Sequence, residues 1–168
     1  MMNIVMVGFM GTGKTSVSRA LARKTGWHCL DVDEWVVKKA GRTIPAIFEA
    51  EGEEGFRNRE TEALREILDG ERQIVAGGGG IVLRPENIAI LKARGTVVCL
   101  TASPETVFAR VGRDSNRPNL NGRRSAAGIA ELMEKREMAY REAADLLIST
   151  DHKTVDAIAE ELRERLGI

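Results

Sequence analysis

The chain has 168 residues, of which 43% are hydrophobic, and its 25 Lys and Arg residues are balanced by 25 Asp and Glu residues. This length favours a single domain, and the apolar fraction is sufficient for a folded core rather than a disordered chain. The balanced charge and an aromatic content of only 4% argue against binding to nucleic acid or to a membrane surface, and no apolar run approaches the ~20 residues that span a bilayer.

The first predicted strand, residues 3–7, is a run of apolar and β-branched residues that we take to leave no room for a signal peptide. Cys29 and Cys99 lie in separate apolar runs, and no second Cys or His stands at metal-ligand spacing from either of them. Free thiols persist in reducing compartments, so we expect both to be buried thiols of a cytoplasmic protein.

The segment from Gly8 to Thr15 spells G-x-x-x-x-G-K-T, the pattern of a phosphate-binding P-loop. It follows the first predicted strand and precedes a predicted helix over residues 15–24, which is the context that the motif requires. The glycines allow successive backbone N–H groups to point at one anion, and the helix N-terminus adds partial positive charge. Lys14 is placed to reach the β- and γ-phosphates of a nucleotide, and the Thr15 hydroxyl to ligate Mg²⁺. The ATP-binding residues expected in this segment are Gly11, Thr12, Gly13, Lys14, Thr15 and Ser16.

Short apolar runs and helical patterns alternate along the rest of the chain. Each run is short and apolar, as expected for parallel strands covered on both faces. The further predicted strands cover residues 28–31, 73–76, 96–101 and 146–149. The further predicted helices are one that begins at Arg84-Pro85-Glu86 and ends near Gly95, one from Pro104 to about Val111 with an N-cap at Ser103, a long one from a cap at Ser125 to about Ala144, and a last one that begins after a cap at Thr154. This alternation predicts an α/β fold with a doubly wound, five-stranded parallel sheet flanked by helices, in which ligands bind beyond the carboxyl ends of the strands.

Two carboxylates follow the second predicted strand. Asp31 is placed to hold Mg²⁺, directly or through water, and Asp33 lies further out, where a second substrate could bind. Asp33 could also be the N-cap of a helix that begins at Glu34, and the sequence does not decide between these roles.

A second candidate site begins at Phe56 and Arg57. An aromatic wall beside a guanidinium suits a small cyclic carboxylate, because Arg binds a carboxylate through two hydrogen bonds. Glu60 could brace Arg57 from three residues further on, although a simple surface salt bridge explains this spacing at least as well. Four glycines, residues 77–80, follow the third predicted strand, and they indicate either a backbone that a ligand approaches closely or a flexible turn.

Residues 110–124 form a basic, loop-like stretch. It lies between the predicted helix that begins at Pro104 and the predicted helix that follows Ser125. Its charged residues are Arg110, Arg113, Arg117, Arg123, Arg124 and Asp114. Since a P-loop already implies a bound anion, we interpret this stretch as a mobile lid that closes over the transferring phosphate rather than as a solvated loop. Arg136 lies on the following helix, and periodicity leaves open whether it faces the site or the solvent.

Taken together, these segments resemble the shikimate kinase family from end to end. The P-loop fits many functions, whereas D-x-D, F-R, G-G-G and R-P in this order are far more specific. Asn119 departs from the family pattern, which usually has Leu there. The shared motifs are G-x-M-G-x-G-K-T at 8–15, D-x-D at 31–33, G-R-T-I at 41–44, I-F-E at 47–49, G-E-E-x-F-R at 52–57, G-G-G at 78–80, R-P-x-L at 117–120 and K-R-x-x-x-Y at 135–140.

The resemblance implies a P-loop NTPase fold similar to that of nucleoside monophosphate kinases. It implies one kinase domain over residues 1–168, with a substrate-binding region at 33–60 and a mobile lid at 112–124, which transfers phosphate from ATP to the 3-hydroxyl of shikimate with Mg²⁺ as cofactor. The catalytic residues that it implies are Lys14, Asp33 and Arg117. The shikimate-binding residues that it implies are Asp33, Arg57, Gly78, Gly79, Gly80 and Arg136, with Phe48 and Phe56 as walls of the pocket. Outside the P-loop it implies Arg110, Arg117 and Lys153 for ATP, and it implies Thr15 and Asp31 for the metal.

Two other functions remain open on the sequence. Another small-molecule kinase, such as a gluconate or nucleoside monophosphate kinase, would share the P-loop and the lid. A GTP-binding switch would carry D-x-x-G and N-K-x-D, and neither string occurs in the chain; a non-catalytic nucleotide sensor would be expected to have lost Lys14 or the metal ligands. A small neutral chain with few aromatic residues shows no interface pattern, so we expect a monomer.

Overall fold

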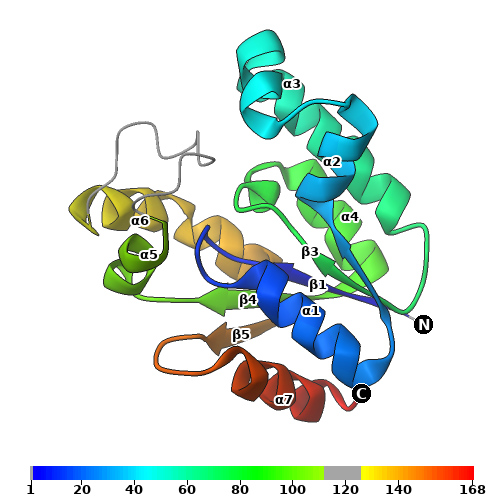
Figure 1. The fold of residues 1–168 in the computed structure, drawn as a ribbon, viewed down its shortest axis with the longest axis vertical. Coiled ribbons are helices and arrows are strands. Elements are labelled where there is room, and N and C mark those ends of the chain that lie inside the picture. Colours follow the sequence, from blue (N-terminus) through cyan, green and yellow to red (C-terminus); the bar gives the residue numbers. More distant parts are fainter. Residues whose placement is uncertain (1, 112–125) are drawn as a thin grey trace.

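The computed structural model describes residues 2–111 and 126–168. These residues form a five-stranded parallel sheet in the order β2-β3-β1-β4-β5, with helices on both faces (Figure 1). The strands are β1 (Asn3–Val7), β2 (His28–Asp31), β3 (Gln73–Ala76), β4 (Gly95–Thr101) and β5 (Leu146–Ser149). The predicted doubly wound fold is therefore confirmed, and each predicted strand matches to within one residue at either end.

The helices connect consecutive strands. They are α1 (Lys14–Thr25), α2 (Val32–Ala40), α3 (Ile44–Ile67), the short 3₁₀ helix η1 (Ile81–Leu83), α4 (Pro85–Arg94), α5 (Pro104–Val111), α6 (Ala126–Ala143) and α7 (Val155–Leu166). The predicted caps at Ser103 and Thr154 are confirmed, because their hydroxyls accept the backbone N–H groups of Thr106 and Ala157. The predicted cap at Ser125 lies outside the described residues. None of the described helices combines the length and apolar character needed to cross a membrane.

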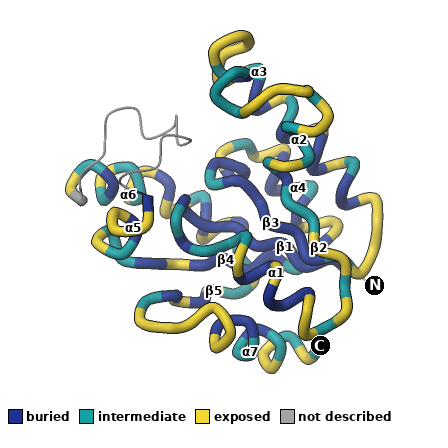
Figure 2. Tube along the Cα trace, in the orientation of Figure 1, coloured by how far each residue is buried: buried dark blue, intermediate teal, exposed yellow. Residues whose placement is uncertain are grey.

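Apolar side chains form a separate cluster on each face of the sheet. Ile4 and Met6 face α1 and α7, whereas Val5 and Val7 belong to the larger cluster that includes residues of α2 to α6. This alternation follows from the two-residue period of a strand, and it explains why β1 is buried along its whole length. Figure 2 shows the buried backbone concentrated in the central strands.

The edge strands depart from the sequence-based expectation. His28 and Cys29 of β2 and Leu147 of β5 are exposed, so the prediction that all strands are covered on both faces is wrong for the edges. For the same reason the prediction that Cys29 is buried is wrong, because this thiol stands on the outermost strand. Cys99 lies in the inner strand β4 and is buried, as predicted.

The sheet order brings distant segments together at one edge. Because the strands are parallel, the segments that follow them leave the sheet on the same side. Strand β1 lies between β3 and β4, and β2 lies beside β3, so the P-loop, the glycine segment 77–80 and the Asp31–Asp33 segment are neighbours in space.

Candidate active site

The P-loop wraps the amino-terminal end of α1. Gly11 and Gly13 adopt positive φ angles of 76° and 93°, which a side chain would disfavour. The Thr12 hydroxyl donates to the carbonyl oxygen of Phe9 at 2.8 Å, and the Lys14 ammonium donates to the carbonyl oxygens of Gly8 and Phe9 at 2.8 and 2.9 Å. The loop is thus braced by its own side chains, with the ammonium beside the backbone that the motif assigns to phosphate.

Two predicted metal ligands are in direct contact. The Thr15 hydroxyl donates to Oδ2 of Asp31 at 2.9 Å, and Oδ1 of the same carboxylate accepts the backbone N–H of Glu34 at 3.2 Å. Hydroxyl and carboxylate oxygens suit a hard cation. In the part of the chain that the structure describes, no three His, Cys, Asp or Glu side chains are grouped as metal ligands, so a cation here would need phosphate and water oxygens as well. The pair therefore fits a nucleotide-bound Mg²⁺ and does not fit a cation held by protein alone.

The alternative that Asp33 is a helix N-cap is wrong, because Asp31 has that role. The helix cap after β2 is Asp31, and α2 begins at Val32, so Asp33 lies within the first helical turn instead of capping it. The helix turns the Asp33 carboxylate toward the glycine segment, where a methyl group built on Gly78 would lie 3.0 Å from its Oδ1.

A cavity of about 230 Å³ unites the P-loop with the ends of the strands. It joins the nucleotide half of the site to Asp33 and to the first three of the four glycines. The lining residues are Gly11, Gly13, Lys14, Thr15, Ser16, Asp31, Asp33, Gly77, Gly78, Gly79, Arg110 and Val111.

Each glycine of the triplet faces a different predicted substrate-binding side chain. A methyl group on Gly78 would lie 2.7 Å from Oε2 of Glu60 and 3.0 Å from Oδ1 of Asp33, and one on Gly80 would lie 2.5 Å from both terminal nitrogens of Arg57. One on Gly79 would lie 3.4 Å from the backbone nitrogen of Met10 and 3.8 Å from Nη1 of Arg136. None of the three has a positive φ angle. Neighbouring side chains therefore leave no room for a methyl group at Gly78 or Gly80, whereas Gly79 has that room, and this favours close approach over a flexible turn at the two outer glycines.

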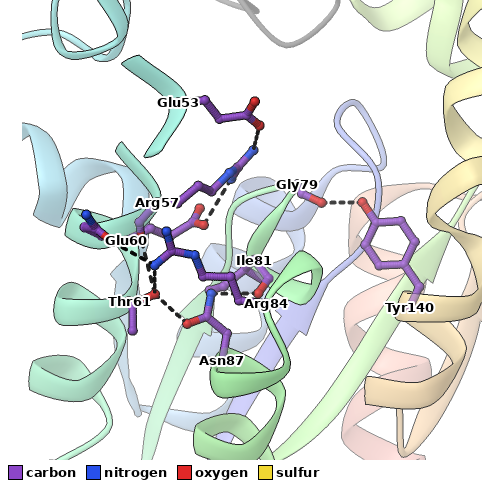
Figure 3. Close-up of polar contacts among 10 residues, drawn as sticks. Glu53, Arg57, Glu60, Thr61, Gly79, Ile81, Arg84, Asn87 and Tyr140 are labelled. Carbon is purple, nitrogen blue, oxygen red and sulfur yellow. Dashed lines mark hydrogen bonds and ion pairs between the residues drawn. The ribbon is translucent and has the colours of Figure 1, made fainter. Parts of the chain in front are cut away.

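Arg57 is held in a buried ion pair. The residue is 5% exposed. Its guanidinium donates to Glu60 at 3.0 Å and to Glu53 at 3.4 Å, and it lies 5.3 Å from the centre of the Phe56 ring. Burial raises the pKa of Glu60 to about 7, an effect that Arg57 opposes and the charge of Asp33 reinforces. The interpretation of Arg57 and Glu60 as a surface salt bridge is therefore wrong, because the Glu60 carboxylate is fully buried. Figure 3 shows this cluster beside the glycine segment.

Arg136 of α6 faces the site and not the solvent, which settles the alternative that periodicity left open. It is 6% exposed, its guanidinium lies 5.6 Å from the centre of the Phe9 ring, and its Nη1 has no hydrogen-bond partner among the described residues. Phe48 and Phe56 stack near the Arg57 side of the site, with ring centres 5.0 Å apart. The half-buried Phe48 ring can line a pocket, whereas Phe56 is 3% exposed and mainly supports Arg57.

Of the other residues predicted to bind ATP, Arg110 lies at the P-loop and Lys153 does not line its cavity. Nη1 of Arg110 donates to the carbonyl oxygen of Gly11 at 2.8 Å, which attaches α5 to the P-loop. Lys153 does not line the cavity at the P-loop, and its ammonium instead donates to Glu161 of α7 at 3.3 Å. Arg117 and the predicted lid at 112–124 lie outside the described residues.

Several polar residues that fix the glycine segment were not predicted from the sequence. The Thr61 hydroxyl donates to Asn87 at 2.7 Å, and the Asn87 amide donates to the carbonyl oxygen of Ile81 at 2.9 Å, which ties α3 and α4 to η1 (Figure 3). On the opposite side the Tyr140 hydroxyl donates to the carbonyl oxygen of Gly79. The four-residue spacing from Arg136 to Tyr140 was the available signal, because it places both on one face of a helix.

A P-loop on a doubly wound sheet, opening into a crevice that also holds buried cationic side chains, defines a nucleotide-dependent phosphotransferase of the P-loop class. Comparison with known proteins gives the family. The model of the family described as Shikimate kinase matches residues 10–167. The chain belongs to the shikimate kinase family.

Relatives and solved structures agree with this assignment. The shikimate kinase of Thermodesulfovibrio yellowstonii is 44% identical over 162 residues, which are 96% of this chain and 93% of the relative. That of Moorella thermoacetica is 44% identical over 164 residues, 98% of this chain and 94% of the relative. A structure of shikimate kinase from Acinetobacter baumannii in complex with shikimate superposes with a TM-score of 0.94 at 40% identity, covering 99% of this chain and 94% of the other.

Proposed function

We propose that this chain transfers the γ-phosphoryl group of ATP to the 3-hydroxyl of shikimate, giving ADP and shikimate 3-phosphate. The observation that carries the proposal is the glycine triplet, because Gly78, Gly79 and Gly80 each adjoin one of the side chains suited to a hydroxylated cyclic acid, next to a P-loop. The similarity to a shikimate-bound structure over nearly the whole chain supports it.

The acceptor would be bound by charge and by backbone. Arg57 and Arg136 are buried cations that adjoin neighbouring glycines of the triplet, Gly80 and Gly79, and together they suit the carboxylate. Asp33 would orient the 3-hydroxyl and accept its proton. Gly78, Gly79 and Gly80 would let the sugar-like ring approach the backbone, with Phe48 and Phe56 at the wall.

The donor would be bound at the P-loop. Backbone N–H groups of residues 11–16 and the Lys14 ammonium would neutralise the phosphates, with Arg117 acting from a lid at 112–124 and Arg110 and Lys153 near the adenine. Mg²⁺ held by Thr15 and Asp31 would neutralise charge on the β- and γ-phosphate oxygens. Since phosphoryl transfer has a loose transition state, positioning and charge neutralisation would supply most of the rate enhancement.

The proposal extends to organisation and setting. We propose a single kinase domain over residues 1–168, with residues 33–60 as the substrate-binding region. We also propose a cytoplasmic monomer without nucleic-acid or membrane partners, on the basis of the balanced charge.

The decisive experiment is an acceptor panel. ADP release from ATP and Mg²⁺ is measured with shikimate, gluconate and nucleoside monophosphates, and with Lys14→Ala as the inactive control. We expect release with shikimate only, with loss of activity in the control. A higher kcat/KM for gluconate or for a nucleoside monophosphate would overturn the proposal.

A further inference from the structure

The hydroxyl of Tyr140 reaches out of α6 to the glycine triplet. The residue is 7% exposed, and its hydroxyl donates to the carbonyl oxygen of Gly79, the middle glycine (Figure 3). Burial raises the pKa of Tyr140 to about 12, which the neighbouring Arg136 guanidinium opposes, so the phenol remains a donor throughout the neutral range. None of the roles proposed above uses this contact.

The contact fixes the direction of a peptide that adjoins the substrate-binding side chains. The carbonyl oxygen of Gly78 accepts from the N–H of Ile81 at 3.2 Å, and that of Gly80 accepts from the N–H of Leu83 at 3.0 Å. With Gly79 bound by Tyr140, every carbonyl of the triplet is engaged within the fold. The polar groups of the triplet that can still face a ligand are its N–H groups.

Planarity of the peptide transmits this constraint to Gly80. The described peptide bonds are all trans, so the carbonyl of Gly79 and the N–H of Gly80 lie in one plane and point in opposite directions. Holding the carbonyl toward α6 therefore turns the N–H of Gly80 away from α6. Gly80 is the glycine that adjoins Arg57 of α3, so Tyr140 sets how the backbone faces the acceptor site.

Tyr140 also stands beside Arg136. The two residues are four apart on α6 and share one face of the helix. On its other side the tyrosine ring borders a cavity of about 660 Å³ that is lined in part by Cys99, Met133 and Leu147. The ring is otherwise packed in the core, and the hydroxyl contact adds a directional restraint at its tip.

We propose that Tyr140 is a positioning residue for the acceptor substrate, which it serves by holding the Gly79–Gly80 peptide and Arg136 in the arrangement that receives a carboxylate-bearing ring. The inference rests on the proposed function, because it concerns the acceptor half of the same site. The hydroxyl of Tyr140 is bound to the acceptor half, at Gly79, whereas its ring borders a cavity that also reaches Phe9 and Thr12 of the P-loop.

Tyr140→Phe tests the proposal, since it removes the hydroxyl and keeps the ring. We expect the KM for shikimate to rise by up to about tenfold, because substrate binding must then order the peptide that the hydrogen bond held, with kcat within about twofold and the KM for ATP unchanged. Met138→Leu is the matched control on the same helix, because Met138 is 83% exposed, and it should leave all three constants unchanged.

A double-mutant cycle separates positioning from general destabilisation. If Tyr140 acts partly through Arg136, Tyr140→Phe and Arg136→Lys should raise the KM for shikimate less in combination than the product of their separate effects. A thermal unfolding curve and an ATP titration confirm that each variant is folded.

Two results would overturn the inference. One is a Tyr140→Phe enzyme whose KM for shikimate stays within twofold of the unsubstituted enzyme. The other is an equal rise in the KM values for shikimate and ATP together with a lower melting temperature, as a purely structural residue would give. Failure of the proposed function is distinct, because the unsubstituted enzyme would then not phosphorylate shikimate.

Discussion

Gly80→Ala isolates the contact between the glycine triplet and Arg57. The φ and ψ angles of Gly80 are −101° and 11°, which alanine can adopt, so the backbone does not oppose the substitution. The new methyl group would lie 2.5 Å from Nη1 and Nη2 of Arg57, whereas ordinary contacts begin at 3.4 Å. The guanidinium must therefore retreat by about 1 Å.

That movement is costly because the guanidinium is enclosed. Glu60 holds it at 3.0 Å, the Phe56 ring lies 5.3 Å away, and Arg57 is 5% exposed. Overpacking of this kind costs about 1–3 kcal/mol. For a chain of this size, 1 kcal/mol lowers the melting temperature by about 2–4 °C, so we expect a fall of about 2–12 °C. Displacement of the carboxylate-binding group by about 1 Å should also reduce shikimate turnover by up to about 10²-fold.

Gly79→Ala is the matched comparison within the same segment. A methyl group there would lie 3.4 Å from the backbone nitrogen of Met10 and 3.8 Å from Arg136, which are ordinary contacts. Melting curves of both variants, followed by circular dichroism, should show a lower temperature for Gly80→Ala and little change for Gly79→Ala. If Gly80→Ala melts with the unsubstituted protein and binds shikimate equally well, the enclosure of Arg57 against the triplet is wrong.

Three further changes test the proposed roles. Arg57→Ala should weaken shikimate binding and leave ATP binding unchanged, as titrations with each ligand would reveal; unchanged shikimate affinity would contradict the role of this guanidinium. Arg117→Ala should lower kcat at least as much as Asp33→Asn, because a transition-state Arg contributes about 10³–10⁵ and a general base about 10²–10⁴, and near-normal turnover without Arg117 would remove the proposed lid role. The Glu60 pKa is raised to about 7, so the folded state binds more protons than the unfolded state between about pH 4.5 and 7, and stability should fall as pH rises through that window by up to about 3 kcal/mol. Urea unfolding at pH 5 and pH 8 should show a smaller loss for Glu60→Gln than for the unsubstituted protein, and equal losses would refute the raised pKa.

The sequence predicts strands well and burial at the edges poorly, for one physical reason. Apart from Asn3, the run Asn3–Val7 is apolar, which identifies a strand covered on both faces. Cys29 and Leu30 form a shorter apolar run between His28 and Asp31, and the order of strands depends on crossovers between distant segments, so this run alone does not reveal that β2 is outermost. The exposure of its thiol was therefore beyond local reasoning.

The same limit separates Asp31 from Asp33. Both carboxylates follow β2 and both suit a helix cap, so composition and spacing treat them alike. The structure distinguishes them because Oδ1 of Asp31 accepts the N–H of Glu34, which starts the helix two residues earlier than an Asp33 cap would. Asp33 is thereby released from capping and faces Gly78.

The two halves of the site differ in how they are encoded, and this explains which half the sequence reveals. The phosphate-binding part of the nucleotide half is local, because residues 8–15 shape the loop by themselves, whereas Asp31 reaches Thr15 across α1 and β2, 16 residues further along the chain. The acceptor half needs α2, α3, the segment after β3 and α6 to meet, and only the order β2-β3-β1 places the segments after β2 and β3 beside the P-loop. The contacts of Tyr140 with Gly79 and of Thr61 with Asn87 join residues that are 61 and 26 positions apart in the chain. A hydroxyl or amide carries no sign of which carbonyl it will meet, so these contacts emerge only once the sheet has been assembled.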